Sequence, residues 1–245
     1  MANITLLIPF YNEGKRILKV LDQMIQIPEI DQIICVDDGS TDNIYEIIQE
    51  NYEVNVIRSF QNRGKSAAVK LGMNHVENDW VFLSDADLCQ IKVEEFRLAC
   101  HYIKHEMIDG IDMIVFRRMK APWFVKYDRG DILFSGERIL KSSELRVILN
   151  NKVEHYQLEI AINQWMLDHD KHVCWLPSSV TNTYKFQKLG LYEGLTKEFR
   201  MWYNLVNYIG VKNYLRQIRK FATTTIPSSI NGSLLSAEEE YITNK

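Results

Sequence analysis

The sequence predicts an α/β protein with a doubly wound, mainly parallel β-sheet. Short apolar runs alternate with amphipathic segments through the first half of the chain. The apolar runs are nearly continuous, as in strands that are buried on both faces. A polar motif follows each of the first four runs. Together these observations favour a parallel sheet that is covered by helices on both sides and that binds ligands at the carboxyl ends of its strands.

Five runs are predicted to be strands: residues 4–9 (ITLLIP), 32–36 (QIICV), 54–58 (VNVIR), 80–84 (WVFLS) and 112–116 (DMIVF). The segments between them are predicted to be helices, near residues 14–25, 42–50, 64–76 and 92–106. After the fifth strand the spacing of apolar and polar residues becomes less regular.

Composition excludes several classes of protein. The 245 residues are 46% hydrophobic and 25% charged, which is ordinary globular material with enough core for one large domain or a domain with an appendage. A net charge of −3 gives no general attraction to nucleic acid, and we expect no such partner. The four cysteines form no C-x-x-C pair, which indicates reduced thiols and disfavours a zinc site.

The N-terminal stretch MANITLLIPFYNEGK has no basic leader and reaches Pro9 too soon for a secretory signal. No apolar run approaches the roughly 20 residues that cross a bilayer. We therefore expect a cytoplasmic protein.

The polar motifs that follow the first four strands are PFYNE (9–13), DDGSTD (37–42), QNRGKS (61–66) and DADL (85–88). Each motif alone is also typical of a turn or a helix cap. Because the carboxyl ends of parallel strands meet at one edge, the four motifs together favour a shared site. In DADL, Asp85 and Asp87 could converge on one divalent cation, or could merely end a strand in a turn.

In this order and at these spacings, IPFYNE, VDDGSTD, NRGKSAAVKLGM and DADL resemble the nucleotide-sugar half of family 2 glycosyltransferases, which have a GT-A fold. The resemblance covers about residues 3–180 and is nearest in style to the polyprenyl-phosphate sugar transferases, of the dolichol-phosphate mannose synthase type. It implies an inverting transfer from a nucleoside-diphosphate sugar to a lipid-linked or glycan acceptor, with Mg²⁺ or Mn²⁺ as cofactor.

The resemblance also assigns roles to residues. The positions that match the family's nucleotide pocket are Pro9, Tyr11, Glu13, Val36 and Asp38. Lys65 offers a positive charge to the nucleotide. Asp85, with Ala86 beside it, matches a residue near the ribose and the metal, and Asp87 matches the residue that binds the ion directly.

Two departures from the family pattern leave roles open. Cys89 stands where the polyprenyl-phosphate enzymes can use a glutamine as a metal ligand, so the third ligand is not identified. His169 or His172 could supply it from the second half, or both could be solvated residues of a surface loop. Glu137, in FSGERIL, replaces the aromatic residue of the family's SGFR segment and could signal a different contact with sugar or acceptor.

Arg118 and Glu159 carry the remaining roles that the resemblance implies. Arg118 matches an arginine directed at the donor phosphates, although a basic surface turn is the alternative. Glu159 matches a recurrent glutamate that removes the proton from an acceptor hydroxyl. If the acceptor is a phosphate, no base is needed, and Glu159 would serve in positioning or helix packing.

The C-terminal third departs from the sheet pattern. Residues 193–222 interleave aromatic and basic residues at helical spacing. That pattern predicts a helix, which could lie on the anionic, cytosolic surface of a membrane or pack back on the domain. We thus expect a nucleotide-sugar half (1–118), an acceptor-side half (119–190), a basic aromatic helical extension (191–222) and a flexible tail (223–245).

Two other functions are compatible with a sheet that binds nucleotide and metal. One is a nucleotidyltransferase that makes the activated sugar, although PFYNE stands where such enzymes have a Gly-rich phosphate loop. The other is a non-catalytic nucleotide-sugar-binding protein, which would share most of these residues.

Overall fold

The computed structural model describes residues 1–151, 157–181 and 208–226. In chain order its elements are β1 (Ile4–Phe10), α1 (Lys15–Met24), β2 (Gln32–Asp37), α2 (Ile44–Asn51), β3 (Asn55–Arg58), α3 (Lys65–Met73), β4 (Trp80–Leu83), α4 (Val93–Lys104), β5 (Met113–Arg118), α5 (Trp123–Tyr127), α6 (Gly130–Leu133), β6 (Arg138–Lys141), α7 (Ser142–Asn150), α8 (Gln157–Asp168), β7 (Val173–Ser178), α11 (Val211–Lys220) and β8 (Thr224–Thr225).

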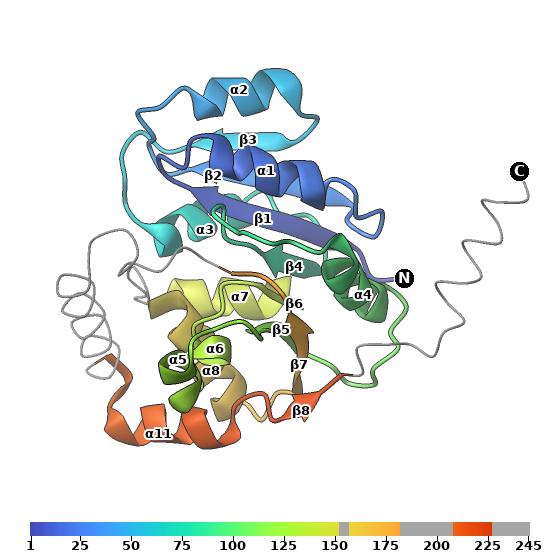
Figure 1. Ribbon diagram of the computed structural model, residues 1–245, viewed down its shortest axis with the longest axis vertical. Coiled ribbons are helices and arrows are strands. Elements are labelled where there is room, and N and C mark those ends of the chain that lie inside the picture. The colour runs from blue at the N-terminus through green and yellow to red at the C-terminus, as the bar shows by residue number, and fades with distance from the viewer. Residues whose placement is uncertain (152–156, 182–207, 227–245) are drawn as a thin grey trace, which may run out of the picture.

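The strands form one sheet in the order β3-β2-β1-β4-β6-β5-β7-β8 (Figure 1). Every neighbouring pair is parallel except the two pairs that include β6, which runs antiparallel between β4 and β5. The α/β fold and the mainly parallel sheet are therefore confirmed. The strand order reverses between β1 and β4, which is where open sheets of this type bind ligands.

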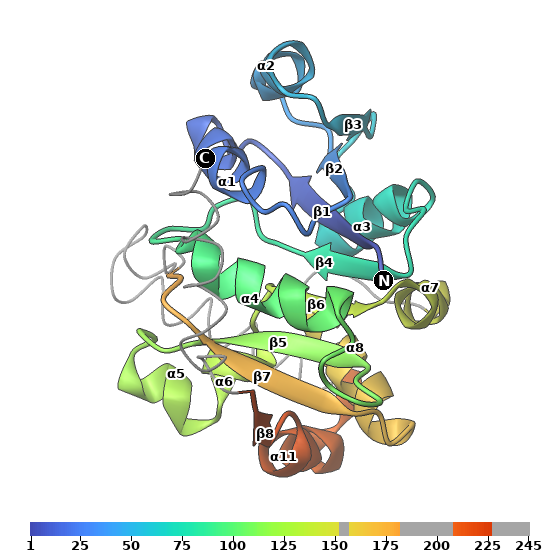
Figure 2. The same cartoon turned by 90° about the vertical axis from the view of Figure 1, so that its right-hand side faces the viewer.

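Helices cover both faces of the sheet, and in Figure 2 α1 and α3 lie on opposite sides of β1. One hydrophobic core joins the sheet to α1, α2 and α4, and the other joins it to α3, α6, α7 and α8. Behind the strand that ends at DADL, the rings of Phe82, Phe96 and Phe116 pack with centroids 4.7–5.6 Å apart. These rings give the end of β4 a closely packed support.

The predicted elements of the first half match the structure closely. All five predicted strands are present, and their ends lie within two residues of the predicted ends. All four predicted helices are also present, and their ends lie within three residues of the predicted ends. The strands are easy to predict because they are buried on both faces: all seven residues of β1 are buried.

The C-terminal prediction needs a correction. Residues 223–226 were expected to begin a flexible tail, but Thr224 and Thr225 form β8 beside β7, and the side chain of Ile226 is buried. The buried, apolar side chain of Ile226 anchors the end of β8, which explains why this short strand forms. Of the predicted helix at 193–222, residues 182–207 lie outside the described residues, as does the rest of the predicted tail (227–245).

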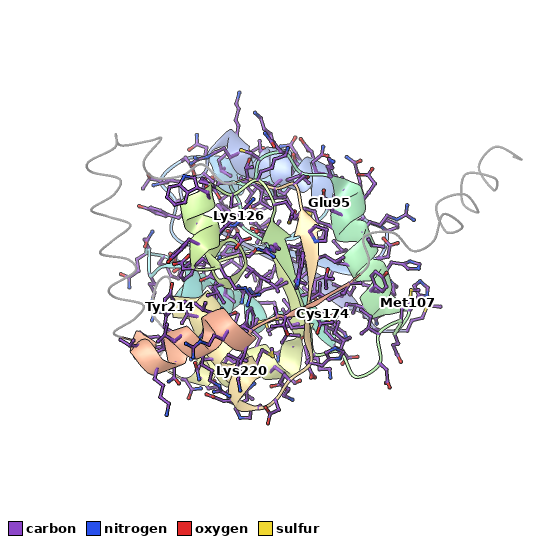
Figure 3. The ribbon with its side chains drawn as sticks, turned by 60° about the horizontal axis from the view of Figure 1, so that its bottom comes forward. Glu95, Met107, Lys126, Cys174, Tyr214 and Lys220 are labelled. Carbon is purple, nitrogen blue, oxygen red and sulfur yellow. The ribbon has the colours of Figure 1, made fainter. Side chains whose placement is uncertain are left out.

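In the described part of that segment, α11 begins after Gly210, which has φ of +81° and interrupts the helix, and α11 packs on the domain. Tyr214, Gln217 and Phe221 are buried, and the Tyr214 hydroxyl donates to Asp128 at 2.8 Å. In Figure 3, α11 runs along the bottom of the view toward β8, with Lys220 at its end. None of the helices in the described ranges combines the length and apolar character that a bilayer span requires.

Candidate functional site

The loops after β1 and β2 are joined by hydrogen bonds at the carboxyl edge of the sheet. The Ser40 hydroxyl accepts from the Asn12 backbone at 2.9 Å, and the Asn12 side chain accepts from the Thr41 backbone at 2.8 Å. The Asp42 carboxylate accepts from the Gly14 backbone at 3.0 Å. The motifs PFYNE and DDGSTD therefore form one connected wall, as their placement at neighbouring strand ends predicted.

The residues predicted for the nucleotide pocket lie in different environments along this wall. Tyr11 is 42% exposed. Glu13 is half-buried and pairs with Arg16 at 2.7 Å. Pro9 and Val36 are neighbours in the β1–β2 register and are both buried. Since the Val36 side chain packs in the core with α3, it can face a ligand only through its backbone.

Asp38 fixes the turn that begins α3. Its carboxylate accepts from the backbone of Arg63 at 3.0 Å and of Gly64 at 2.6 Å, and burial raises its pKa above the ordinary value. The two loops approach so closely that a Cβ on Gly39 would lie 2.7 Å from the Gln61 carbonyl carbon. Because Gly39 also has φ of +78°, only glycine suits this position. The predicted contact of Asp38 with base or ribose would have to share these acceptor oxygens.

A cluster of three charged side chains lies where α3, β4 and α8 meet. The Lys65 ammonium, on the first residue of α3, is 2.5 Å from the Asp85 carboxylate and 2.6 Å from the Glu159 carboxylate. Although burial opposes both charges, the mutual attraction raises the pKa of Lys65 and lowers that of Asp85. Lys65 and Asp85 are therefore both charged at neutral pH, and the Lys65 charge that was expected to face the nucleotide is shared by two carboxyl groups.

The segment 135–137 packs against Asp85 from the other side. A Cβ on Gly136 would lie 2.3 Å from an Asp85 carboxylate oxygen, so any larger residue would displace that carboxylate. Glu137 is fully buried, accepts from the Ser135 hydroxyl at 3.0 Å and hydrogen-bonds Asp85. Burial, and then the negative charge of Asp85, raise the pKa of Glu137 to about 7. The residue that departs from the family's SGFR pattern thus lies directly beside the DADL motif.

Arg118 lies beside the same cluster. The alternative interpretation of Arg118 as part of a basic surface turn is therefore wrong. It is 8% exposed, and its guanidinium donates to the carbonyls of Gly130 and Phe134 at 3.3 Å each. Its charge favours ionisation of Asp85 and Glu137. Its Nε is buried without a hydrogen-bond partner among the described residues. Arg118 is therefore a buried cation beside Asp85, and its contact with the donor phosphates stays a prediction.

The acids of DADL suit a hard divalent cation. Asp87 is half-buried between the buried Ala86 and Leu88 on the loop after β4. Within the described ranges, no three His, Cys, Asp or Glu side chains form a group that could hold a metal. A site of one or two carboxylates, completed by substrate phosphates and water, is typical of Mg²⁺. The donor set therefore fits a cation that binds together with a diphosphate.

The structure corrects the idea that His169 or His172 completes this site. His172 directly precedes β7 and is held by Asp109 and Asp112, at the amino edge of the sheet, whereas DADL follows β4 at the carboxyl edge. His169 is exposed and stacks on Trp165 with ring centroids 3.7 Å apart. Both are surface-loop residues, as the alternative stated.

Sequence reasoning missed two fully buried polar residues behind the cluster. Arg138 donates to the Glu159 carbonyl at 3.3 Å and to the Asn163 side chain at 3.0 Å. In the sequence, Arg138 opens an apolar strand and Asn163 interrupts the apolar residues of a helix. Such interruptions were the only available signal, and they are equally typical of exposed positions.

Comparison with known proteins adds independent findings. The model of Glycosyl transferase family 2 matches residues 5–157, more than half of the chain. A dolichyl-phosphate beta-glucosyltransferase of Saccharomyces cerevisiae is 36% identical over 98 residues, 34% of this chain and 29% of the relative. The undecaprenyl-phosphate 4-deoxy-4-formamido-L-arabinose transferase of Proteus mirabilis is 33% identical over 134 residues, 50% of this chain and 40% of the relative. The chain thus spans less than half of either relative.

Among solved structures, the glucosyl-3-phosphoglycerate synthase of Mycobacterium tuberculosis, in complex with Mn²⁺, uridine diphosphate and phosphoglyceric acid, superimposes with a TM-score of 0.68. The match covers 89% of this chain and 78% of that one at 16% identity. At this identity the likeness concerns the fold, and it extends over both halves of the sheet.

Proposed function

The chain belongs to glycosyl transferase family 2, and from this we propose that it moves a sugar from a nucleoside-diphosphate donor to the phosphate of a lipid carrier. The transfer inverts the anomeric carbon and depends on Mg²⁺ or Mn²⁺. The relatives that act on dolichyl and undecaprenyl phosphates support this acceptor. Family membership also favours sugar transfer over nucleotidyl transfer.

The ion pair between Lys65 and Glu159, at 2.6 Å, is the observation on which we choose between a hydroxyl and a phosphate acceptor. A hydroxyl acceptor must lose its proton as it attacks, so it needs a carboxylate that readily takes a proton. In this structure an oxygen of the Glu159 carboxylate already accepts a hydrogen bond from the Lys65 ammonium group, so this side chain is engaged within the protein rather than held ready for an acceptor hydroxyl. A phosphate acceptor is already ionised at neutral pH. The pairing of Glu159 therefore supports a phosphate acceptor and a positioning role for this residue.

In the proposed reaction, an oxygen of the lipid phosphate attacks the anomeric carbon as the bond from that carbon to the donor diphosphate breaks. The products are a glycosyl phospholipid and a nucleoside diphosphate. Asp87, with Asp85, would hold the cation, which when bound stabilises the negative charge on the departing diphosphate. Tyr11 and the wall of loops 11–14 and 38–42 would bind the nucleoside. Arg118 would supply further positive charge to the phosphates.

The two faces of α11 support a place at a membrane surface. The inner face packs on the domain, so the core-packing interpretation holds for that side. The outer face carries exposed Val211 and Leu215 among exposed basic residues, which are Lys212, Arg219 and Lys220. An apolar and basic surface of this kind suits an anionic, cytosolic leaflet where a lipid-linked acceptor is confined.

A donor and acceptor panel tests the proposal. Nucleotide sugars would be incubated with the protein and Mn²⁺ or Mg²⁺, with undecaprenyl phosphate, with dolichyl phosphate, or with an oligosaccharide. Release of nucleoside diphosphate and the mass of the lipid product would be measured. We expect a glycosyl phospholipid with one donor. Transfer only to the oligosaccharide would overturn the phosphate acceptor, and donor binding without turnover would favour a non-catalytic protein.

A further inference from the structure

Gln217, on the C-terminal helix α11, is fully buried and makes hydrogen bonds with both ends of its amide. Its Nε2 donates to the Ile160 carbonyl and to the Gln164 side chain, at 3.2 Å each. Its Oε1 accepts from the Asn163 side chain at 3.3 Å. All of these partners lie on α8, the helix that carries Glu159.

The hydrogen-bonded chain continues inward from Asn163. The Asn163 amide donates to the Leu133 carbonyl at 3.0 Å, and its Oδ1 accepts from the Arg138 guanidinium at 3.0 Å. Arg138 is completely buried. Burial lowers its pKa, although the carboxylates of Glu159 and Glu137 oppose that shift.

Arg138 joins the two sides of the charged cluster. Its guanidinium donates to the Glu159 carbonyl at 3.3 Å and to the Ser135 carbonyl at 3.1 Å. Ser135 precedes Gly136, which lies in contact with the Asp85 carboxylate. One guanidinium therefore holds the backbone on both sides of the Lys65 ion pairs.

Such a network requires all of its members. A buried donor or acceptor that loses its partner keeps its full desolvation cost, so neighbouring groups shift to recover hydrogen bonds. Removal of the Gln217 amide would leave the Asn163 amide with one acceptor fewer and free it to turn away from Arg138. The first turn of α8, and with it the Glu159 carboxylate, would shift as a result.

We propose that Gln217 is a positioning residue for sugar transfer, which acts through Asn163 and Arg138 on Glu159 and Asp85. The C-terminal helix is thus part of the catalytic apparatus although it supplies no group to the substrate. The activity readout rests on the proposed function, and a second readout is independent of it.

The main variant is Gln217→Met, which keeps the length of the side chain and removes its hydrogen bonds. The matched control is Gln49→Met, the same substitution at an exposed position of α2. We expect Gln217→Met to lower kcat about tenfold or more, since a displacement of about 1 Å can cost that much, with the KM for donor unchanged. Gln49→Met should match the wild type. A role in stability alone would lower Tm and leave kcat of the folded enzyme unchanged.

A double variant tests the route. If Gln217 acts through Asn163, then Gln217→Met in an Asn163→Leu background should lower kcat no further than Asn163→Leu alone. Independent, multiplicative losses in the double variant would overturn the route that we assign.

The second readout is the rate at which an amine-reactive acylating reagent labels Lys65, measured by peptide mass spectrometry. The Lys65 ammonium is held by Asp85 and Glu159, so loosening of the cluster by Gln217→Met should raise its labelling severalfold, and Gln49→Met should not. If the wild type transfers no sugar, the proposed function fails and labelling alone decides: raised labelling supports the linkage, and unchanged labelling overturns it. If the wild type is active, unchanged kcat in Gln217→Met overturns the proposal.

Discussion

At Lys65, a single ammonium group serves two carboxylates that belong to distant parts of the chain. Asp85 follows β4, and Glu159 lies 94 positions beyond Lys65. The positive charge of Lys65 is also the largest of the interactions that lower the pKa of Asp85. The first residue of α3 therefore links β4 to α8 and helps to keep Asp85 ionised.

Asp87 is the acid expected to bind the cation most directly. We predict that Asp87→Asn removes transfer activity and weakens Mn²⁺-dependent donor binding much more than it changes folding, because Asp87 is half-buried on a strand-end loop. Calorimetry of donor binding with and without Mn²⁺ measures the effect, and thermal unfolding reports on the fold. An Asp87→Asn protein with wild-type turnover would refute the metal assignment.

Glu159 distinguishes the two kinds of acceptor. With a lipid phosphate, Glu159→Gln should lower kcat by no more than about tenfold, the size expected of a positioning residue, since no proton has to be removed. With a hydroxyl acceptor the same change should lower kcat by about 100-fold or more and leave donor affinity intact. Steady-state kinetics on each acceptor gives the answer. A 100-fold loss on a proven phosphate acceptor would contradict the positioning role.

Glu137 should make stability depend on pH. Its pKa is raised to about 7 in the folded protein, from about 4.3 in the unfolded chain. Protonation of Glu137 therefore stabilises the folded protein fully below about pH 4.3, and this stabilisation is lost as pH rises through 7. We predict that the free energy of unfolding of the wild type declines between about pH 5 and 7 relative to Glu137→Gln, which has no proton to lose. Urea unfolding of both proteins across this range measures the difference. Parallel curves would show that Glu137 does not titrate there.

At the scale of elements, the loop before α3 depends on the end of β2. Asp38→Ala would leave the backbone N–H groups of Arg63 and Gly64 without their acceptor, at a cost of about 1–3 kcal/mol in the free energy of unfolding. Asp38→Asn, which keeps one oxygen acceptor, should lose less. Chemical denaturation of the two variants provides the comparison. Equal losses would mean that the carboxylate does not hold this loop.

The elements of the first half could be predicted because each carries its own local signal. The strands are apolar runs buried on both faces, and the four motifs follow from the rule that parallel strands end at one edge. The second half gives weaker signals. β6 is a four-residue strand that begins with the buried Arg138, and its antiparallel place between β4 and β5 depends on pairing across the sheet. No spacing in the sequence specifies that pairing.

The same distinction applies to the site. Asp85, Asp87 and Arg118 could be found because motifs and strand ends point to them. The ion-pair partners of Lys65 could not be predicted, since Glu159 reaches Lys65 through the packing of α8 on α3. The contact of Gln217 with Asn163 could not be predicted either, because it spans 54 positions and involves residue types that are usually exposed.

At the scale of the whole molecule, α11 should bind membranes through its outer face. We predict that the full chain sediments with anionic liposomes at low salt and is released as salt rises, because each exposed Lys or Arg contributes on the order of 1 kcal/mol. Neutralising Lys212, Arg219 and Lys220 together should abolish sedimentation and leave donor binding intact. Sedimentation over a salt series measures this.

Arg216 is better left unchanged in that experiment, because it pairs with Asp168 and donates to the Leu167 carbonyl at 2.7 Å. Its loss would disturb the docking of α11 on α8 as well as the surface charge. If the wild type ignores anionic liposomes at low salt, α11 serves only in packing, and a glycan acceptor becomes the leading choice.

The contact between Gln217 and α8 also bears on how the protein is made. Helix α8 ends at Asp168, and Gln217 is added 49 residues later. At about 5–20 residues per second, those residues take about 2–10 s to synthesise. During that interval a nascent chain already carries the DADL acids and most of the sheet, while α8 is still without its partner helix. Each new molecule therefore passes through a period in which its nucleotide-binding half can fold before its charged cluster can be fixed in place.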